Sequence, residues 1–221
     1  MPGASRRLAI LCSALLFAVP RLGFAQTHGT SDDLPIPEHA LRPLRVEVLG
    51  SAGFGDVRIS TGESVNSYGP GFTLRAAWRF GFGATFGLRW DHFLGTSSEY
   101  SWTGVARLQY ATGATFPLAE LGYELLLPHA FVRPHVAVGA GSLRRSVQCN
   151  SADGSFHAIA DQLCADADRA ESAARGWAFA VAPGLTMGLR TGRFHAMVEP
   201  RYYVRDAANA FAIAAGVGFV F

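Results

Sequence analysis

The sequence predicts an all-β protein, an antiparallel up-and-down transmembrane β-barrel of eight strands. Three observations support this fold class. Segments of about ten residues repeatedly alternate apolar with polar side chains, which is the weak but repeated signature of barrel strands. Their connections are alternately short and long, and the last segment stays apolar up to Phe221. After residue 25 no apolar run reaches the ~20 residues of a spanning helix, so only strands that close on themselves could cross a membrane.

Residues 1–25 have the organisation of a secretory signal peptide. Arg6 and Arg7 form a positive n-region, and an apolar core of about a dozen residues follows. Such a core is too short for a spanning helix, which needs ~20 residues. Small residues then precede a cleavage position. We therefore expect an exported chain that is cleaved after Ala25 and begins at Gln26.

The charge of the exported chain argues against a nucleic-acid partner. The chain of 221 residues has 19 basic and 17 acidic residues, and every basic residue is arginine. Cleavage would remove 25 residues and three arginines, which leaves 196 residues with a net charge of −1. A chain of this length forms one domain. Residues 26–43 are polar and contain three prolines, so we expect a periplasmic lead-in there and the barrel at residues 44–221.

The first four strands are predicted at residues 44–54, 72–80, 84–91 and 118–127. In each, the apolar register is assigned to lipid and the polar or small register to the lumen. The outward residues that define them, in order, are Val46, Val48 and Ala52; Phe72, Leu74, Ala76, Trp78 and Phe80; Ala84, Phe86, Leu88 and Trp90; and Leu121, Tyr123 and Leu125.

The last four strands are predicted at residues 132–139, 177–189, 194–203 and 211–221. Three of them contain a proline, which cannot donate to a sheet ladder, so we expect locally weaker pairing there. Their outward residues are Val132, Pro134, Val136 and Val138; Trp177, Phe179, Val181, Pro183, Leu185, Met187 and Leu189; Phe194, Ala196, Val198, Pro200 and Tyr202; and Phe211, Ile213, Ala215, Val217, Phe219 and Phe221.

Residues 95–115 also alternate, and they would make a ninth span that leaves the two termini on opposite sides. Bacterial single-chain barrels have even strand numbers. We therefore interpret this stretch as an extension of the third and fourth strands into a long hairpin above the membrane. The short turns near residues 82, 129 and 192 then face the periplasm, and the long loops at 55–70, 95–115 and 146–174 face outward.

The terminal strand resembles the C-terminal signal strand of Gram-negative outer-membrane β-barrels, which typically ends on phenylalanine. With the signal peptide and the strand number, residues 44–221 resemble the small OmpA/OmpX/OmpW-type barrels. The resemblance implies a monomer in the bacterial outer membrane, in contact with outer-membrane lipid. It also implies recognition of the C-terminal strand by the barrel-assembly machinery, with Phe219 and Phe221 as the assembly signal. No motif singles out one member of this group.

The inward register carries acids and bases in equal number, inside a barrel just wide enough for side chains. Unpaired buried charges are costly, so we expect these groups to pair and close the lumen, with Glu124–Arg133 and Glu47–Arg79 as the clearest contacts. The alternative is an ion gate in which exchanged partners open a narrow path. The lumen positions are Glu47, Arg75, Arg79, Arg89, Asp91, Glu120, Glu124, Arg133, Glu199 and Arg201.

No catalytic, cofactor or metal site emerges from the residues. Asp91 and His92 are neighbours on one strand and therefore point to opposite faces. His135 and His195 point into the lumen, where a histidine is more often a hydrogen-bonded filler than a base. We therefore predict a non-enzymatic protein with a structural or surface-interaction role. A narrow, porin-like pore for ions or small hydrophobic solutes is the alternative, and a barrel enzyme that modifies lipid or cleaves protein is the third reading.

The outer loop at residues 146–174 contains two cysteines, Cys149 and Cys164. A pair of cysteines in an exported chain favours a disulfide over a metal site. Closing a loop of this length is worth about 3 kcal/mol in the chain-entropy account. The alanine-rich stretch at residues 158–174 favours a short helix. Such a disulfide-clipped loop could recognise an extracellular partner or could simply cap the barrel mouth.

Overall fold

The structure is a computed structural model. It describes residues 43–58, 64–102, 106–151, 161–162, 164–166, 169, 176–205 and 209–221, all of them in one compact unit, Pro35–Phe221. The predicted signal peptide at residues 1–25 and almost all of the lead-in at residues 26–43 lie outside the described residues.

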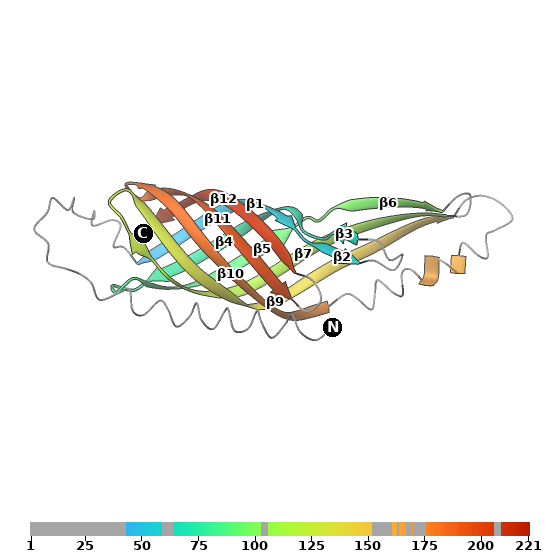
Figure 1. Cartoon of the computed structure of the whole chain (residues 1–221), viewed down its shortest axis with the longest axis horizontal. Helices are drawn as coiled ribbons and strands as arrows, with labels where there is room; N and C mark the ends of the chain where they lie inside the picture. Colours follow the sequence, from blue (N-terminus) through green and yellow to red (C-terminus); the bar gives the residue numbers. More distant parts are fainter. Residues whose placement is uncertain are drawn as a thin grey trace, which may run out of the picture. The chain divides into compact units, whose positions relative to one another are not determined.

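Eight antiparallel strands close into a barrel, which confirms the predicted fold class (Figure 1). Each barrel strand pairs with the next one along the chain, and the last pairs with the first, from Arg45 opposite Val220 to Phe54 opposite Phe211. The barrel strands are β1 (Leu44–Phe54), β4 (Gly69–Arg79), β5 (Ala84–Phe93), β7 (Ala106–Tyr123), β9 (Ala130–Ser151), β10 (Gly176–Thr191), β11 (Phe194–Arg205) and β12 (Ala210–Val220).

The remaining strands extend the barrel at its ends. β6 (Ser97–Trp102) pairs with the first part of β7, which then continues into the barrel, so the long-hairpin interpretation of residues 95–115 is confirmed. The outer part of β9 also pairs with β7, and these three strands reach beyond the barrel (Figure 1). A small hairpin joins β2 (Asp56–Arg58) to β3 (Ser64–Asn66), and β8 (Leu125–Leu126) pairs with β9.

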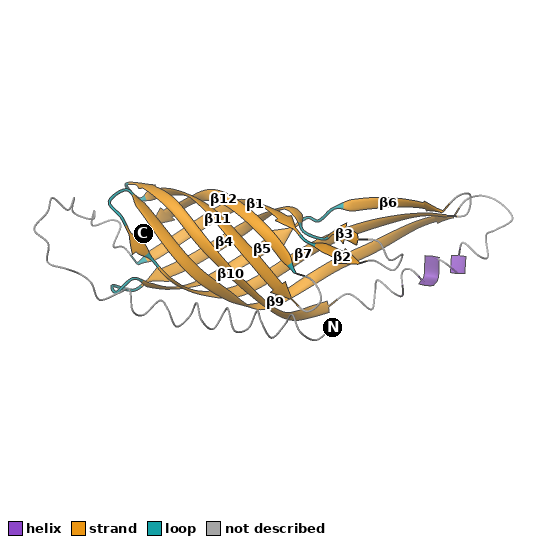
Figure 2. Ribbon diagram, in the orientation of Figure 1, coloured by secondary structure: helices purple, strands orange, loops and turns teal. Residues whose placement is uncertain are grey.

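Short helical pieces lie in the long outer loop after β9, at residues 161–162, 164–166 and 169 (Figure 2). They confirm the helix predicted from the alanine-rich composition. None of the helical segments that the structure describes is both long and apolar enough to span a membrane.

The short turns meet at one end of the barrel, as predicted. The amide of Arg190, beside the β10–β11 turn, donates to His129 in the β8–β9 turn at 2.8 Å, and the amide of Glu124 donates to Gly83 in the β4–β5 turn at 2.7 Å. The amide of Phe221 donates to the carbonyl of Leu44 at 2.9 Å, so the start of β1 and the end of β12 lie at the same end of the barrel.

Prolines coincide with gaps in the sheet ladders. The β10–β11 register pairs Val181 with Val204, Gly184 with Arg201 and Met187 with Val198, and skips the positions around Pro183 and Pro200. The β7–β9 register skips Phe116 and Pro117. The missing proline N–H explains these gaps. The ladder is nevertheless continuous through Pro134, which lies opposite Leu185.

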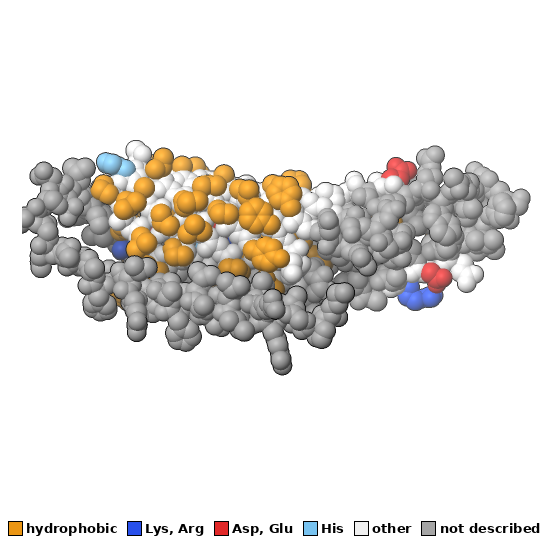
Figure 3. Space-filling model, viewed as in Figure 1, with side chains coloured by type: hydrophobic (Ala, Val, Ile, Leu, Met, Phe, Trp, Pro, Cys, Tyr) orange, Lys and Arg blue, Asp and Glu red, His pale blue; other side chains and the backbone are white. Residues whose placement is uncertain are grey.

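The barrel has an apolar outside and a polar inside. Large hydrophobic side chains cover the outward face of the barrel strands (Figure 3), while arginine, glutamate and aspartate side chains are buried inside. This distribution is that of an outer-membrane β-barrel, whose outward face contacts lipid. Outward residues from all eight barrel strands, such as Val48, Leu74, Trp90, Leu121, Val138, Phe179, Val198 and Ile213, are exposed.

Closure of the barrel depends on close backbone approach at Gly216. A Cβ there would lie 2.1 Å from the carbonyl oxygen of Val48 and 2.6 Å from the Cα of Leu49 on the neighbouring strand. We expect Gly216→Ala to destabilise the folded barrel by at least about 2 kcal/mol. The added methyl group would meet backbone atoms, which cannot move aside as a flexible side chain can. The midpoint of the heat-dependent gel shift in detergent measures this.

Gly176→Ala is the matched control, because a Cβ at Gly176 would meet nothing within 4 Å. An equal midpoint for the two variants would show that the β1–β12 contact is not tight.

Candidate functional site

Four aromatic rings fill the lumen toward its outer end. Tyr68, Phe93, Phe116 and Tyr203 are all fully buried, with ring centroids 4.7 Å apart for Phe116 and Tyr203 and 5.4 Å apart for Tyr68 and Phe93. Three of the rings come from β5, β7 and β11, and Tyr68 precedes β4. This aromatic layer was not predicted from the sequence, because Tyr68 belongs to a glycine- and serine-rich connection in which apolar and polar residues do not alternate.

Asp91 joins the aromatic layer to the charges below it. Its carboxylate accepts hydrogen bonds from the Tyr203 hydroxyl at 2.8 Å, the Thr73 hydroxyl at 2.6 Å and a guanidinium N–H of Arg201 at 2.6 Å. The Arg89 side chain adds an ion pair at 3.1 Å. A carboxylate with this many donors is held in one orientation.

Glu199 and Glu120 form the centre of the lumen with two arginines. Arg89 donates to Glu120 at 2.9 Å through one terminal nitrogen and to Glu199 at 2.9 Å through the other. Arg75 donates to Glu199 at 2.5 Å and approaches Glu120 at 3.4 Å. The Thr186 hydroxyl donates to Glu199 at 2.8 Å. These contacts connect five strands, β4, β5, β7, β10 and β11.

Glu47 is shared by three cationic or titratable partners. It pairs with Arg75, accepts two hydrogen bonds of 2.9 Å from Arg133 and lies 3.0 Å from the Nε2 atom of His195. The β1–β4 register places Arg75 directly opposite Glu47. The predicted Glu47–Arg79 contact is therefore wrong, because Arg79 lies four residues further along β4 and contacts Glu124 instead.

Glu124 lies at the end of the lumen where the short turns meet. Its main partner is Arg45, which donates to both carboxylate oxygens across the lumen, one of these bonds being 2.6 Å long. Arg79 approaches it at 3.4 Å, and Arg133 only at 3.9 Å, so the predicted Glu124–Arg133 pair is present but loose. The ring of Phe131 lies between Arg45 and Arg133, with each guanidinium carbon 5.7 Å from its centroid.

All ten residues predicted to form the lumen network are buried in the structure. The structure adds two arginines, Arg45 and Arg190, which are also buried and which share the inward register of their strands. The alternation in the sequence already places Arg45 inward, beside Glu47, and continuing it along β10 could have found Arg190. Their contacts could not have been found in this way, since Arg45 and Glu124 meet from opposite sides of the barrel.

The two other predicted groups are described only in part. Nothing is described of the Cys149 side chain, whereas Cys164 lies on the helical piece at residues 164–166, so their pairing stays a prediction. Phe219 and Phe221 pack edge to face with centroids 4.8 Å apart, and Phe194 packs on Phe219 at 5.0 Å. Phe221 is exposed. Their role as an assembly signal stays a prediction.

The described histidines do not form a catalytic arrangement with the buried carboxylates. Asp91 is buried in the lumen, while His92 lies on the outer face of β5, with its Nδ1 atom 2.9 Å from the Thr115 hydroxyl. His135 lies 3.5 Å from Glu199 and is buried within the charge network. Among the described residues, no group of three or more histidine, cysteine, aspartate or glutamate side chains could hold a metal ion.

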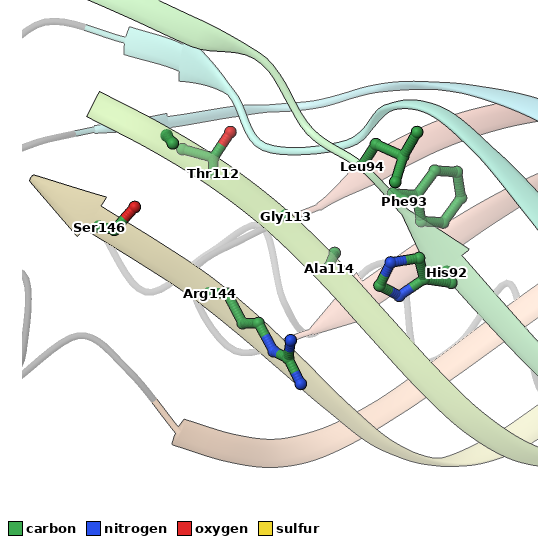
Figure 4. A pocket seen from close by; sticks show the side chains of 9 residues that line it. His92, Phe93, Leu94, Thr112, Gly113, Ala114, Arg144 and Ser146 are labelled. Atoms are coloured by element: carbon green, nitrogen blue, oxygen red, sulfur yellow. The ribbon is translucent and has the colours of Figure 1, made fainter. Parts of the chain in front are cut away.

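A shallow groove of about 450 Å³ lies on the outer surface where β5 leaves β7 (Figure 4). Gly113 lies in its floor, with His92 and Leu94 on one side and Arg144 and Ser146 on the other. The groove faces away from the lumen, so it is not continuous with the charge network.

Neither a protein-family model nor a curated protein matches the sequence. Among solved structures, the barrel is similar to Ail, the attachment invasion locus protein of Yersinia pestis, with 10% identity, a TM-score of 0.45, and 81% of this chain and 99% of that chain covered. It is also similar to Neisserial surface protein A (15%, 0.40, 80% and 97%) and to the N-terminal barrel domain of Pseudomonas aeruginosa OprF (13%, 0.40, 81% and 98%). Likenesses this distant assign the chain neither a family nor a function.

Removal of the Asp91 charge tests the energetic weight of the network. We expect Asp91→Asn to lower the free energy of unfolding by about 3–5 kcal/mol, because it leaves buried arginine charge without its anion. Urea titration of the refolded barrel, followed by tryptophan fluorescence, measures the change.

Asp166→Asn is the control, because Asp166 forms an exposed ion pair with Arg169 at 3.1 Å. Exposed ion pairs contribute little to the free energy of unfolding. A loss for Asp91→Asn no larger than that of the control would contradict a stabilising role for the network.

Proposed function

We propose that this outer-membrane barrel is non-enzymatic, has a closed lumen, and serves envelope structure or surface interaction through its outer strands and loops. The observation that carries the proposal is the filled lumen. Side chains from opposite walls meet at every level, from the aromatic rings through the charge network to Glu124 and its arginines. An eight-stranded barrel is narrow enough for such side chains to fill it.

Arg75 shows how the filling ties the walls together. From β4, its guanidinium reaches Glu47 on β1, Glu199 on β11 and the Thr186 hydroxyl on β10. Charge-assisted hydrogen bonds of this kind are strong and directional. A solute would have to displace several of them at once, which supports a closed scaffold over an open channel.

The burial of the titratable groups supports a non-enzymatic role. His135, His195 and the carboxylates around them are buried and contact one another, so no substrate could approach them without opening the barrel. A general base must come within hydrogen-bond reach of its substrate. His92 faces outward instead, and the hydrogen-bond partner described for its ring is the Thr115 hydroxyl.

The outer strands offer the surface for an interaction. β6, β7 and β9 form a sheet that extends beyond the barrel, and Cys149 lies in its outermost part. We propose that the loop at residues 146–174, clipped by a Cys149–Cys164 disulfide, presents a recognition element to an extracellular partner. The protein would act as a monomer surrounded by outer-membrane lipid, inserted by the barrel-assembly machinery through Phe219 and Phe221.

A narrow pore is the second candidate, and one observation favours it. Glu124 has three arginines within 4 Å, namely Arg45, Arg79 and Arg133. A carboxylate with several cationic partners can exchange them at low energetic cost. Such an exchange is what a gate at this end of the lumen would require.

Planar-bilayer recording separates the two candidates. For a closed scaffold we expect no steady single-channel current from the refolded protein, nor from a Glu124→Gln variant, once the heat-dependent gel shift has verified folding. Steady conductance that changes in Glu124→Gln, but not in the exposed control Asp166→Asn, would make the pore the better reading.

The disulfide has a separate test. Without reductant we expect no free thiol in the exported chain, and a peptide map that joins Cys149 to Cys164. The double variant Cys149→Ser, Cys164→Ser should still fold and give a heat-dependent gel shift, because the barrel is closed by its strand ladders. It should be cut faster by protease in the outer loop. Two titratable thiols in the exported chain would contradict the clip.

A further inference from the structure

The charges in the lumen do not balance. Among the described residues, seven arginines are buried against five carboxylates. An unpaired buried charge is costly in free energy, so the surplus calls for a compensating anion. The arginines are Arg45, Arg75, Arg79, Arg89, Arg133, Arg190 and Arg201, and the carboxylates are Glu47, Asp91, Glu120, Glu124 and Glu199.

The surplus is confined to the end where the short turns meet. In the rest of the lumen, Arg75, Arg89 and Arg201 share four carboxylates, Glu47, Asp91, Glu120 and Glu199. At the turn end lie the other four arginines and the single carboxylate of Glu124. Arg45, Arg79 and Arg133 contact this carboxylate, and Arg133 also reaches Glu47.

Among the described residues, Arg133 and Arg190 each have two buried donor atoms without an acceptor. Arg190 donates through Nη2 to the carbonyls of Leu127 and Ala130, while its buried Nε and Nη1 atoms have no hydrogen-bond partner. Arg133 uses Nη2 for Glu47, and its buried Nε and Nη1 atoms also have none. Glu124 does not satisfy Arg133, because its nearest oxygen lies 3.9 Å from the Nη1 atom, beyond hydrogen-bond reach.

The site is reached from the periplasmic side. Arg79 and Arg190 are the most exposed of the seven arginines, at 8% and 7%, whereas Arg133 is at 0%. Both flank tight turns, Arg79 at the end of β4 and Arg190 next to the last residue of β10. Their side chains therefore form the rim of the mouth, with Arg133 and the Arg45–Glu124 pair behind them.

We propose that this mouth, formed by Arg79, Arg133 and Arg190, is a binding site for a phosphate group. Guanidinium groups recognise phosphate oxygens through paired, charge-assisted hydrogen bonds. A bound phosphate would neutralise the local surplus of positive charge and accept the free N–H donors at the same time. The group could belong to a free phosphate compound of the periplasm or to the headgroup of an inner-leaflet lipid.

Calorimetry on the full-length chain, refolded in phosphate-free maltoside micelles, tests the site with sodium pyrophosphate as the probe. We expect saturable binding, and a higher gel-shift midpoint than in sodium chloride of equal ionic strength. Arg190→Gln and Arg79→Gln should each weaken binding at least about tenfold, since each removes charge-assisted hydrogen bonds. Arg193→Gln, an exposed arginine in the β10–β11 turn, should leave binding unchanged.

A second arm mixes phosphatidic acid into the micelles in place of pyrophosphate. If only the lipid stabilises the barrel in a saturable way, and this effect is lost in the same variants, a lipid headgroup is the source of the phosphate. If pyrophosphate binds and raises the gel-shift midpoint, the source is a soluble compound. No response to either probe, or an equal loss in Arg193→Gln, overturns the proposal. If Arg190→Gln does not fold, Arg79→Gln decides, because Arg79 makes a single ion-pair contact among the described residues.

Discussion

The buried network of guanidinium and carboxylate groups is the interaction on which the rest of the structure depends. A barrel that turns its apolar side chains to lipid must place its polar ones inside, where the medium screens charges poorly. Each arginine of the central lumen therefore has to meet carboxylates from other strands. Asp91, Glu120 and Glu199, together with Glu47, satisfy Arg75, Arg89 and Arg201 in this way. Eight strands leave a narrow interior, and the inward register places these charges inside it, where each has to find a partner.

The same requirement makes closure of the barrel cooperative. Arg45 and Glu124 are 79 residues apart in the chain, and Arg75 and Glu199 are 124 residues apart. Neither pair can form in a single hairpin, so this stabilisation appears only when several strands have assembled. The tight β1–β12 contact at Gly216 acts at the same step, because it brings the first and last strands together. Loose assemblies of hairpins would keep desolvated charges without partners, which favours the closed state over partly assembled ones.

The strand positions and the inward-facing residues could be predicted from the sequence, because a period of two assigns each side chain to one face. The bounds of the first strand, Leu44–Phe54, were predicted without error. Which charges touch could not be predicted, because that depends on register and on reach across the lumen, as the Glu47–Arg79 error shows. Tyr68 was missed because a residue in an irregular connection carries no periodic signal. The surplus of arginine at the turn end was missed because Arg45 and Arg190 were not counted among the lumen charges.

The interrupted ladder between β10 and β11 has a mechanical consequence. Between Val181 and Met187 the two strands share only the Gly184–Arg201 register position. Fewer backbone hydrogen bonds therefore hold β10 to β11 here than hold the neighbouring strand pairs together. The side chains of Thr186 and Glu199 bond to each other beside the gap, at 2.8 Å. Under lateral tension in the bilayer, strain would therefore concentrate between β10 and β11. The side-chain contacts inside the lumen would then keep these two strands from separating.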